Sequence, residues 1–332
     1  MSNNNTSEET PSSKDEKKGQ VKKTLIRLLI SIIAFIALIK FGKVNVKEAL
    51  SHLSKMNLLY FGISYIFYTG TIFFSGVRFH IASQALGFKK SINQCIQLNY
   101  VGSFFNNFLP TTFGGDALRG YYLQRGSNIS LSKTAGCVLC ERYFGMVVLF
   151  WFCSLTFLFK RFGFIQNNLW NVPIQMEYFA HLGTFGSIFV IPFIPQIKVM
   201  IFGKENWMYK KFIEPIIVYW NSYGLSLKII FYSMLLQLFV IVCHYYLALA
   251  FNLNIPLSYY FIFYPLTTIA GFLVPSLNGL GVREGTYIYF LSLIGIEKDI
   301  GLAFSMGFLI VLLITSVIGG LVYMMGDFRK NH

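Results

Sequence analysis

A long uncharged stretch dominates the sequence. The 54 residues from Ile229 to Val282 contain no Asp, Glu, Lys or Arg, and the adjacent charges Arg283 and Glu284 then follow in a glycine-rich turn. As a single helix this stretch would extend roughly 80 Å, far beyond a hydrocarbon core of about 30 Å. We therefore expect a chain that crosses a membrane and turns back within this stretch, with functional residues near the turn.

The composition also favours a membrane protein. Hydrophobic residues make up 55% and charged residues 13% of the 332-residue chain, which leaves too little polar surface for a soluble particle. The net charge of +14 would suit a nucleic-acid ligand, but the basic residues lie between apolar segments, where they orient a membrane protein. We expect no nucleic-acid partner and no cofactor. We also expect no metal site, because the His and Cys residues lack a complete metal-ligand pattern.

Apolar segments predict an all-α polytopic membrane protein with about six transmembrane helices. We expect a disordered cytoplasmic tail over 1–23, a membrane domain over 24–327 and a short cytoplasmic tail over 328–332. The first predicted span, Leu25 to Ile39, has the character of an uncleaved signal anchor. The other predicted spans are about 57–78, 134–159, 179–196, 229–251 and 300–326.

Two further segments predict re-entrant hairpins made of broken helices. Ser91 to Gly115 is uncharged but rich in Asn and Gln, and hydrocarbon would leave these amides without hydrogen-bond partners. The second segment is broken between about 258–274 and 285–296 by a Pro, an Asn and two Gly residues. Its second part would be roughly 18 Å long, which is too short to span a bilayer alone.

Counting the charges on each side supports an inverted repeat. With both termini in the cytoplasm and each hairpin returning to its own face, 19 Lys and Arg fall in cytoplasmic segments and seven in outer ones. Each half, about 24–160 and about 178–327, then holds three spans and one hairpin. An odd number of crossings inverts the second half relative to the first. This architecture is typical of transporters, and we expect it in the cytoplasmic membrane of a bacterium or archaeon.

The two predicted hairpin turns share residue types that break helices. Pro lacks the amide hydrogen that a helix needs, and Gly permits tight backbone turns. We expect new helices to begin near Gly115 and Gly281, where their positive amino-terminal ends would attract an anion. The residues predicted to form the hairpins are Pro110, Gly114, Gly115, Pro275, Gly279 and Gly281.

Charged residues near these turns are the candidate substrate-binding residues. Charges at membrane depth are costly, so they need partners or a hydrated cavity. Asp116 and Arg119 lie three residues apart on one helical face, while the neighbours Glu141 and Arg142 point in different directions and need partners elsewhere. Two interpretations stay open: structural ion pairs alone, or arginines that also contact a substrate. The candidates are Asn107, Asp116, Arg119, Glu141, Arg142, Arg283 and Glu284.

Three ordered motifs resemble a known family. They run from Asn106 to Gly120 (NNFLPTTFGGDALRG), from Glu141 to Gly145 (ERYFG) and from Pro275 to Gly285 (PSLNGLGVREG). They are similar to the transmembrane region of lysylphosphatidylglycerol synthases and of their stand-alone, flippase-like relatives. The resemblance implies a role in moving aminoacylated phospholipids or polyprenyl-linked lipids between leaflets. It also implies roles for the residues at the motif positions, which are Asn107, Pro110, Gly114, Gly115, Arg119, Glu141, Arg142, Pro275, Gly279, Gly281, Arg283 and Glu284.

The leading hypothesis is therefore a lipid flippase or scramblase whose partner is a membrane lipid with an anionic phosphate headgroup. Because the chain ends at His332, we expect it to lack the aminoacyl-transferase domain of bifunctional relatives, and it lacks an ATP-binding motif. We thus expect transport rather than catalysis. Two alternatives stay open: a membrane-embedded transferase acting on a lipid-linked sugar or phosphate, and a non-transporting partner of a separate lipid-modifying enzyme.

Overall fold

The computed structural model describes residues 45–108, 114–165, 172–190, 218–219, 221–274 and 279–326. Within these ranges every regular element is helical, which confirms the predicted fold class. The predicted signal anchor, both tails, Pro110 and Pro275 lie outside the described residues, and so does the end of the predicted span 179–196. The total of six spans therefore stays a prediction.

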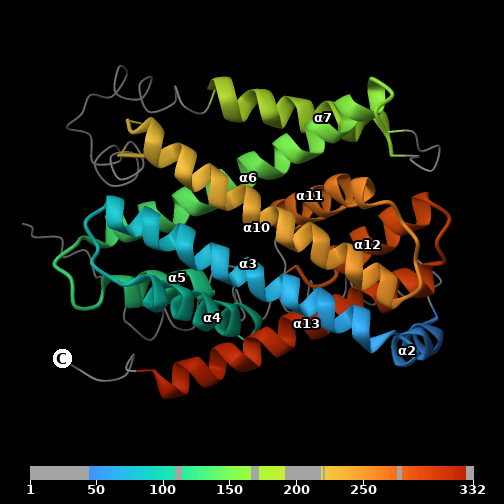
Figure 1. The fold of residues 1–332 in the computed structure, drawn as a ribbon, viewed down its shortest axis with the longest axis horizontal. Coiled ribbons are helices and arrows are strands. Elements are labelled where there is room, and N and C mark those ends of the chain that lie inside the picture. The colour runs from blue at the N-terminus through green and yellow to red at the C-terminus, as the bar shows by residue number, and fades with distance from the viewer. Residues whose placement is uncertain are drawn as a thin grey trace, which may run out of the picture.

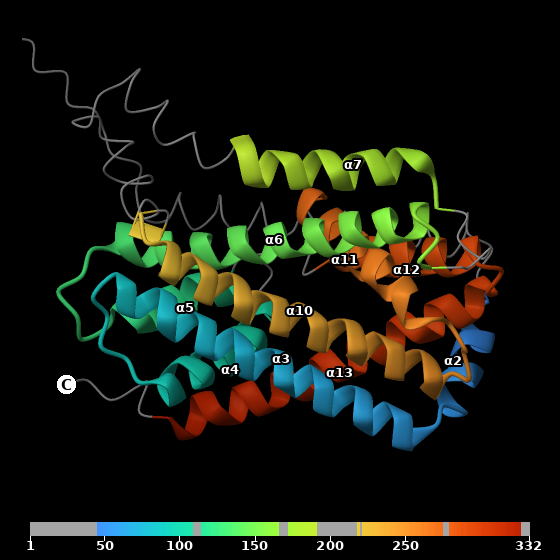
Figure 2. The same ribbon diagram turned by 45° about the horizontal axis from the view of Figure 1, so that its top comes forward.

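Four long apolar helices form the frame of the molecule. They are α3 (Leu58–Ala85), α6 (Leu131–Arg161), α10 (Tyr223–Ala250) and α13 (Lys298–Met325), and among the described residues these four are long and apolar enough to cross a membrane. Helices α3 and α10 run side by side in both views, and α6 and α13 cross them in Figure 1 (Figures 1 and 2). Each overlaps a predicted span, although α3 continues from the predicted end at 78 to Ala85. Helix α7 (Ile174–Phe185), followed by the short π-helix η1 (Gly186–Val190), packs beside α6.

Two pairs of shorter helices lie within this frame. The first pair is α4 (Ile92–Phe108) and α5 (Gly114–Gln124), of 17 and 11 residues, and the second is α11 (Leu257–Leu273) and α12 (Val282–Leu293), of 17 and 12 residues. We call them the first and second hairpin. At 1.5 Å per residue, α5 and α12 extend only roughly 17 to 18 Å, about half of a hydrocarbon core.

The two hairpins open toward opposite ends of the molecule. In Figure 1 the connections that flank the first hairpin, from α3 to α4 and from α5 to α6, lie at the end where the C-terminus is drawn. The connections that flank the second hairpin lie at the other end, beside α2 (Val46–Ser54). This arrangement is the one that an inverted repeat predicts.

Protein contacts explain how α4, a helix rich in amides, lies inside the bundle. Ser75 Oγ donates to Asn99 Oδ1 at 2.8 Å, and the Gly115 amide donates to Asn106 Oδ1 at 2.9 Å. A Cβ atom added at Gly115 would lie 2.0 Å from the carbonyl oxygen of Gly102, so only glycine permits α4 and α5 to pack this closely. The prediction that these amides face protein or water is thus confirmed for the buried half of α4.

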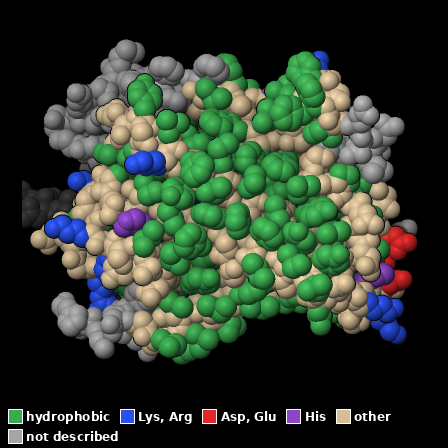
Figure 3. Space-filling view, viewed as in Figure 1, with side chains coloured by type: hydrophobic (Ala, Val, Ile, Leu, Met, Phe, Trp, Pro, Cys, Tyr) green, Lys and Arg blue, Asp and Glu red, His purple; other side chains and the backbone are tan. Residues whose placement is uncertain are grey.

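The surface has the polarity expected of a protein that sits in a bilayer. On the face shown in Figure 3, hydrophobic side chains cover the middle, whereas Lys and Arg side chains gather toward the two ends. Hydrocarbon can contact such a middle zone without desolvating a charge. Charged residues inside the bundle are therefore exceptions within an otherwise apolar zone.

Candidate functional site

A cavity of about 380 Å³ lies between the two hairpins. Helices α3 to α6 of the first half and α10 to α13 of the second half all contribute to its lining. The charged lining residues are Arg78, Arg119, Glu141, Arg142 and Arg283. The cavity thus brings side chains from distant parts of the sequence to one place in the middle of the bundle.

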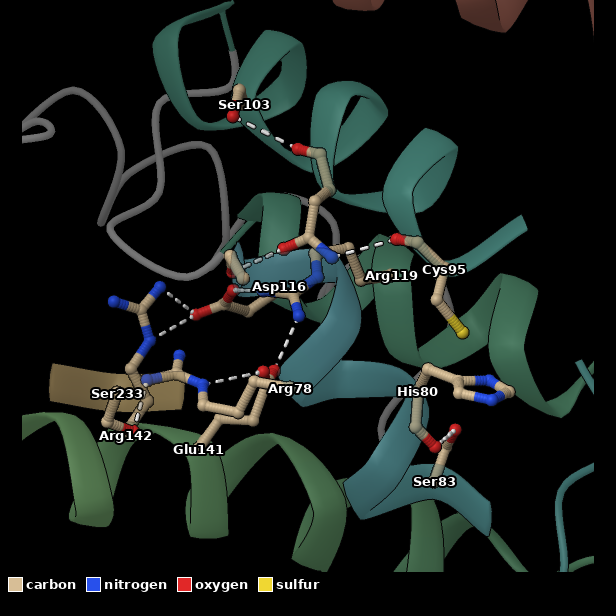
Figure 4. A network of polar contacts seen from close by, with 12 residues as sticks. Arg78, His80, Ser83, Cys95, Ser103, Asp116, Arg119, Glu141, Arg142 and Ser233 are labelled. Carbon is tan, nitrogen blue, oxygen red and sulfur yellow. Dashed lines mark hydrogen bonds and ion pairs between the residues drawn. The ribbon is translucent and has the colours of Figure 1, made fainter. Parts of the chain in front are cut away.

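A network of buried ion pairs forms the wall of this cavity on the side of the first hairpin (Figure 4). Arg119 on α5 bridges two carboxylates: its Nη1 donates to Asp116 Oδ1 at 3.2 Å and its Nη2 donates to Glu141 Oε2 at 2.5 Å. Arg119, Asp116 and Glu141 are only 7%, 3% and 2% exposed. Buried charges are tolerated only when paired, so each member depends on the others.

Two more arginines extend the network, one through each carboxylate. Arg142 donates from Nε to Asp116 Oδ2 at 2.9 Å and from Nη2 to the same oxygen. Arg78 on α3 donates from Nε to Glu141 Oε1 at 3.1 Å, and from Nη1 to Ser233 Oγ of α10 at 3.0 Å. Four helices, α3, α5, α6 and α10, are therefore joined by charge-assisted hydrogen bonds, which are stronger than neutral ones.

The second hairpin carries a separate ion pair at the start of α12. Arg283 Nη2 donates to Glu284 Oε1 at 2.8 Å, and Glu284 Oε2 accepts from the Gly281 amide at 2.6 Å. Gly281 has φ of 83°, a left-handed conformation that glycine adopts without strain. The carboxylate of Glu284 therefore caps α12 while it holds the Arg283 guanidinium beside the cavity.

The predicted helix start near Gly281 is confirmed, because helix α12 begins at Val282, directly after its N-cap Gly281. Helix α5 is described from Gly114 onward, so the other predicted start, near Gly115, stays a prediction. An α-helix carries a partial positive charge at its first turn because its amide hydrogens there lack partners within the helix. Arg119 and Arg283 lie within the first two turns of these helices. The guanidinium groups of Arg119 and Arg283 thus bring positive charge from both hairpins to the cavity.

The predicted site residues do not all face the cavity. Arg119, Glu141, Arg142 and Arg283 line it, while Asp116 and Glu284 are partners of those lining arginines. The lining amide on α4 is Asn106, whereas the predicted Asn107 points its Nδ2 at Ser316 Oγ of α13. Of the predicted hairpin residues, Gly279 lines the cavity.

Arg78 is the functional candidate that sequence reasoning missed. The predicted second span ends at this residue, because a charge is taken as the end of an apolar segment. The structure places it inside α3, 7% exposed, where it lines the cavity and holds Glu141. Gly87 is the signal that could have extended the predicted helix past position 78, because glycine often follows a helix end. It has φ of 92° and lies just beyond the end of α3.

Comparisons with known proteins agree with this architecture. The family model described as "Lysylphosphatidylglycerol synthase TM region" matches residues 24–320. A protein of Methanocaldococcus jannaschii described as a UPF0104 membrane protein is 27% identical over 213 residues, which cover 58% of this chain and 81% of that protein. The matched region contains all of the described cavity-lining residues.

Proposed function

Because the chain belongs to the family of lysylphosphatidylglycerol synthase transmembrane regions, we propose that it is a flippase or scramblase that moves lipids between the leaflets of a membrane. Its substrate is a phospholipid, aminoacylated or not, or a polyprenyl-linked lipid. The headgroup passes through the cavity between the hairpins, and the lipid tails stay in hydrocarbon. Both termini lie in the cytoplasm and the membrane is that of a bacterial or archaeal cell, in keeping with the positive-inside rule.

One observation supports this proposal most directly: both hairpins contribute arginines to the lining of the same cavity. Arg119 in the middle of α5 and Arg283 in the first turn of α12 both line the same space of about 380 Å³. Half-helices that present their amino-terminal ends to one central site occur in transporters, where alternate tilting of two repeats exposes the site to each side in turn. A phosphate group is an anion that can bind both the amino-terminal ends of helices and guanidinium groups.

Desolvation explains why such a protein helps a lipid headgroup to cross. A charged group at the centre of a bilayer costs about 2.5 to 3.5 kcal/mol on insertion scales. A phosphate in the cavity meets fixed guanidinium donors instead of hydrocarbon, so the barrier to leaflet exchange falls. The network of ion pairs holds those donors in place before the lipid enters.

The transferase alternative finds less support in the geometry. A general base needs a carboxylate or imidazole that can take a proton from the substrate. Asp116, Glu141 and Glu284 each accept from at least one guanidinium within the described residues. Protonating Glu141 or Glu284 would leave buried Arg78 or Arg283 without its carboxylate partner, which opposes acid–base chemistry at these two positions.

Reconstitution into liposomes tests the proposal. Purified full-length protein is incorporated with a fluorescent phospholipid, and a membrane-impermeant reductant is then added. The reductant bleaches only the outer leaflet when lipids do not exchange, and it bleaches both leaflets when they do. We expect full bleaching with the protein, and a rate roughly tenfold lower for Arg142→Gln, equivalent to about 1.4 kcal/mol of barrier.

Lys133→Gln is the matched control, because Lys133 is exposed in the first turn of α6 and does not line the cavity. It removes the same charge and should exchange lipids at the wild-type rate. Bleaching that equals protein-free liposomes for anionic, aminoacylated and polyprenyl lipids alike contradicts the proposal and favours a non-transporting role.

A further inference from the structure

The two halves of the described structure repeat the same pattern of helices. Helices α3 and α10 have 28 residues each, and helices α4 and α11 have 17 residues each. Helix α10 also begins as far after α3 in the sequence as α11 begins after α4. Because the two hairpins open toward opposite ends of the molecule (Figure 1), the two-fold axis that relates the halves exchanges these ends. Under this axis α10 corresponds to α3, α11 to α4 and α13 to α6.

The halves meet at three interfaces. Helix α3 packs along α10 in the centre, α4 packs against the C-terminal half of α13, and α6 packs against α11. In both views α6 and α11 lie on one side of the α3–α10 pair, and α4 lies with the C-terminal half of α13 on the other side (Figures 1 and 2). We call the two outer interfaces the α4–α13 seam and the α6–α11 seam. The repeat relates them to each other, so halves in identical conformations would pack both seams equally.

The α4–α13 seam is closed by backbone contact. A Cβ atom added at Gly319 of α13 would lie 2.0 Å from the carbonyl oxygen of Tyr100 on α4. Further along the seam, Ser316 Oγ donates to the carbonyl oxygen of Ser103 at 3.2 Å. The two helices therefore touch along this seam with no space between their backbones.

The α6–α11 seam, by contrast, contains the cavity. Met146 of α6 and Thr268 and Phe272 of α11 line it. A Cβ atom added at Gly271 of α11 would meet nothing within 4 Å. Helix α6 thus packs less closely against α11 than α4 packs against α13. The two seams that the repeat relates are in different states, one closed and the other parted by the cavity.

Contacts along the central pair hold α3 to α10. The amide of Asn57, the N-cap of α3, donates to the carbonyl oxygen of Ala250 at the end of α10, at 2.8 Å. Beyond the middle of α3, the ring centroids of Phe74 and Phe239 lie 4.9 Å apart in an edge-to-face arrangement. These contacts oppose separation of the two helices, so movement between the halves is easiest as a tilt about this pair.

We propose that the α3–α10 pair is a pivot about which the two halves tilt, so that the α4–α13 and α6–α11 seams open in turn. A tilt about a central pair parts one outer seam as it closes the other, so packing lost at one seam is regained at the other. The described state has the α4–α13 seam closed, and the alternate state has the α6–α11 seam closed. Because the two-fold axis exchanges the ends of the molecule, the two openings lead from the cavity to opposite leaflets. The inference rests on the proposed function for the lipid that uses these openings.

Spin labels test whether the two seams move in opposite directions. Each interface offers one exposed side chain on each helix: Gln97 and Leu321 at the α4–α13 seam, Leu155 and Leu257 at the α6–α11 seam, and Phe73 and Leu238 at the pivot. The five native cysteines are buried, so paired Cys substitutions at these positions accept the label selectively. Distances within each pair are measured by pulsed electron paramagnetic resonance on full-length protein in liposomes of phosphatidylglycerol and phosphatidylcholine.

Gly319→Ala provides the perturbation, because the added methyl group does not fit against the Tyr100 carbonyl. We expect it to raise the population with a longer distance at the α4–α13 seam and a shorter one at the α6–α11 seam. The pivot distance should not change. Gly62→Ala, where nothing lies within 4 Å of the added Cβ, should give wild-type distances at all three interfaces. Unchanged seam distances in Gly319→Ala, or two seams that lengthen together, would overturn the inference.

Cross-linking adds a functional measurement that does not depend on Gly319. A short, reducible bis-thiosulfonate bridges the same Cys pairs. Bridging Gln97→Cys to Leu321→Cys should reduce leaflet exchange to the level of protein-free liposomes, and reduction of the bridge should restore it. Bridging Phe73→Cys to Leu238→Cys across the pivot should leave exchange at its unbridged rate. Exchange that continues with the α4–α13 seam fully bridged, or that stops with the pivot bridged, would contradict the pivot.

The two proposals can fail separately, because the distances are measured without lipid exchange. Opposed seam movements in a protein that exchanges no lipid support the pivot and contradict the flippase. Lipid exchange without opposed seam movements supports the flippase and contradicts the pivot.

Discussion

The guanidinium of Arg142 lies over the ring of Phe272, with 5.6 Å between the guanidinium carbon and the ring centroid. Arg142 belongs to α6 of the first half and Phe272 to α11 in the second hairpin, and both line the cavity. This cation–π contact therefore joins the two halves across the space through which the headgroup is proposed to move. Relative motion of the halves must break it.

Replacing Phe272 with Leu should accelerate leaflet exchange. The change removes the aromatic face and keeps an apolar side chain, so about 0.5 to 2 kcal/mol of attraction between the halves is lost. We expect a severalfold higher exchange rate in liposomes and a midpoint of thermal unfolding in detergent that is lower by a few degrees at most. A rate equal to wild type would show that separation of Arg142 from Phe272 does not limit exchange.

Glu141 should be more important for folding than its neighbours in the network. Glu141→Gln leaves the buried guanidinium groups of Arg78 and Arg119 without this carboxylate, so we expect a loss of about 3 to 5 kcal/mol in the free energy of unfolding. Arg78→Met should cost less, because Glu141 keeps Arg119. The double variant should be more stable than the sum of the two single effects predicts, by about 1 kcal/mol or more.

Chemical unfolding of the purified protein in detergent measures this cycle. Additive effects of the two substitutions would contradict the direct coupling between Arg78 and Glu141.

A methyl group at Gly115 should destabilise the first hairpin. It would lie 2.0 Å from the Gly102 carbonyl oxygen, and backbone cannot move aside as a flexible side chain can. We expect Gly115→Ala to cost about 1 to 3 kcal/mol of stability. Gly62→Ala is the control, since nothing lies within 4 Å of an added Cβ on α3 there, and alanine should gain about 0.5 to 1 kcal/mol as a better helix former.

Equal unfolding midpoints for the two variants would contradict the close packing of α4 against α5.

Cysteine labelling should place the bases of the two hairpins on opposite sides of the membrane. Lys89, between α3 and α4, and Asn254, between α10 and α11, are both exposed. The five native cysteines are all buried, so background labelling should be low. A membrane-impermeant maleimide added to intact cells should label Asn254→Cys, and Lys89→Cys should react only after the cells are opened. Labelling of both from the same side would contradict the inverted arrangement.

Much of the fold could be predicted because hydrocarbon imposes simple rules on a sequence. A membrane helix needs about 20 apolar residues, and four such stretches became α3, α6, α10 and α13. The helix start at Val282 followed from a glycine-rich break, and the pair between Asp116 and Arg119 followed from their spacing. These features are local in the sequence.

The rest of the site depends on tertiary structure. The sequence indicates that Glu141 needs a partner elsewhere, but the identity of that partner depends on how α3 and α5 pack against α6. Arg78 was missed because a charge was taken as the end of a span, although an interior arginine with a buried carboxylate partner can lie within one. Side chains of consecutive residues in an α-helix point in directions about 100° apart. The sequence alone therefore could not decide whether Asn106 or Asn107 faces the cavity.

Blocking the cavity in working protein tests the central claim most directly. Thr268 lines the cavity and is partly accessible, so Thr268→Cys can be modified with a bulky thiol reagent, while Asn254→Cys accepts the same reagent outside the cavity. If headgroups pass between the hairpins, leaflet exchange by Thr268→Cys falls to the level of protein-free liposomes after modification, and exchange by modified Asn254→Cys does not change. Exchange that continues at its original rate after Thr268→Cys has been fully modified would contradict passage of the headgroup through this cavity.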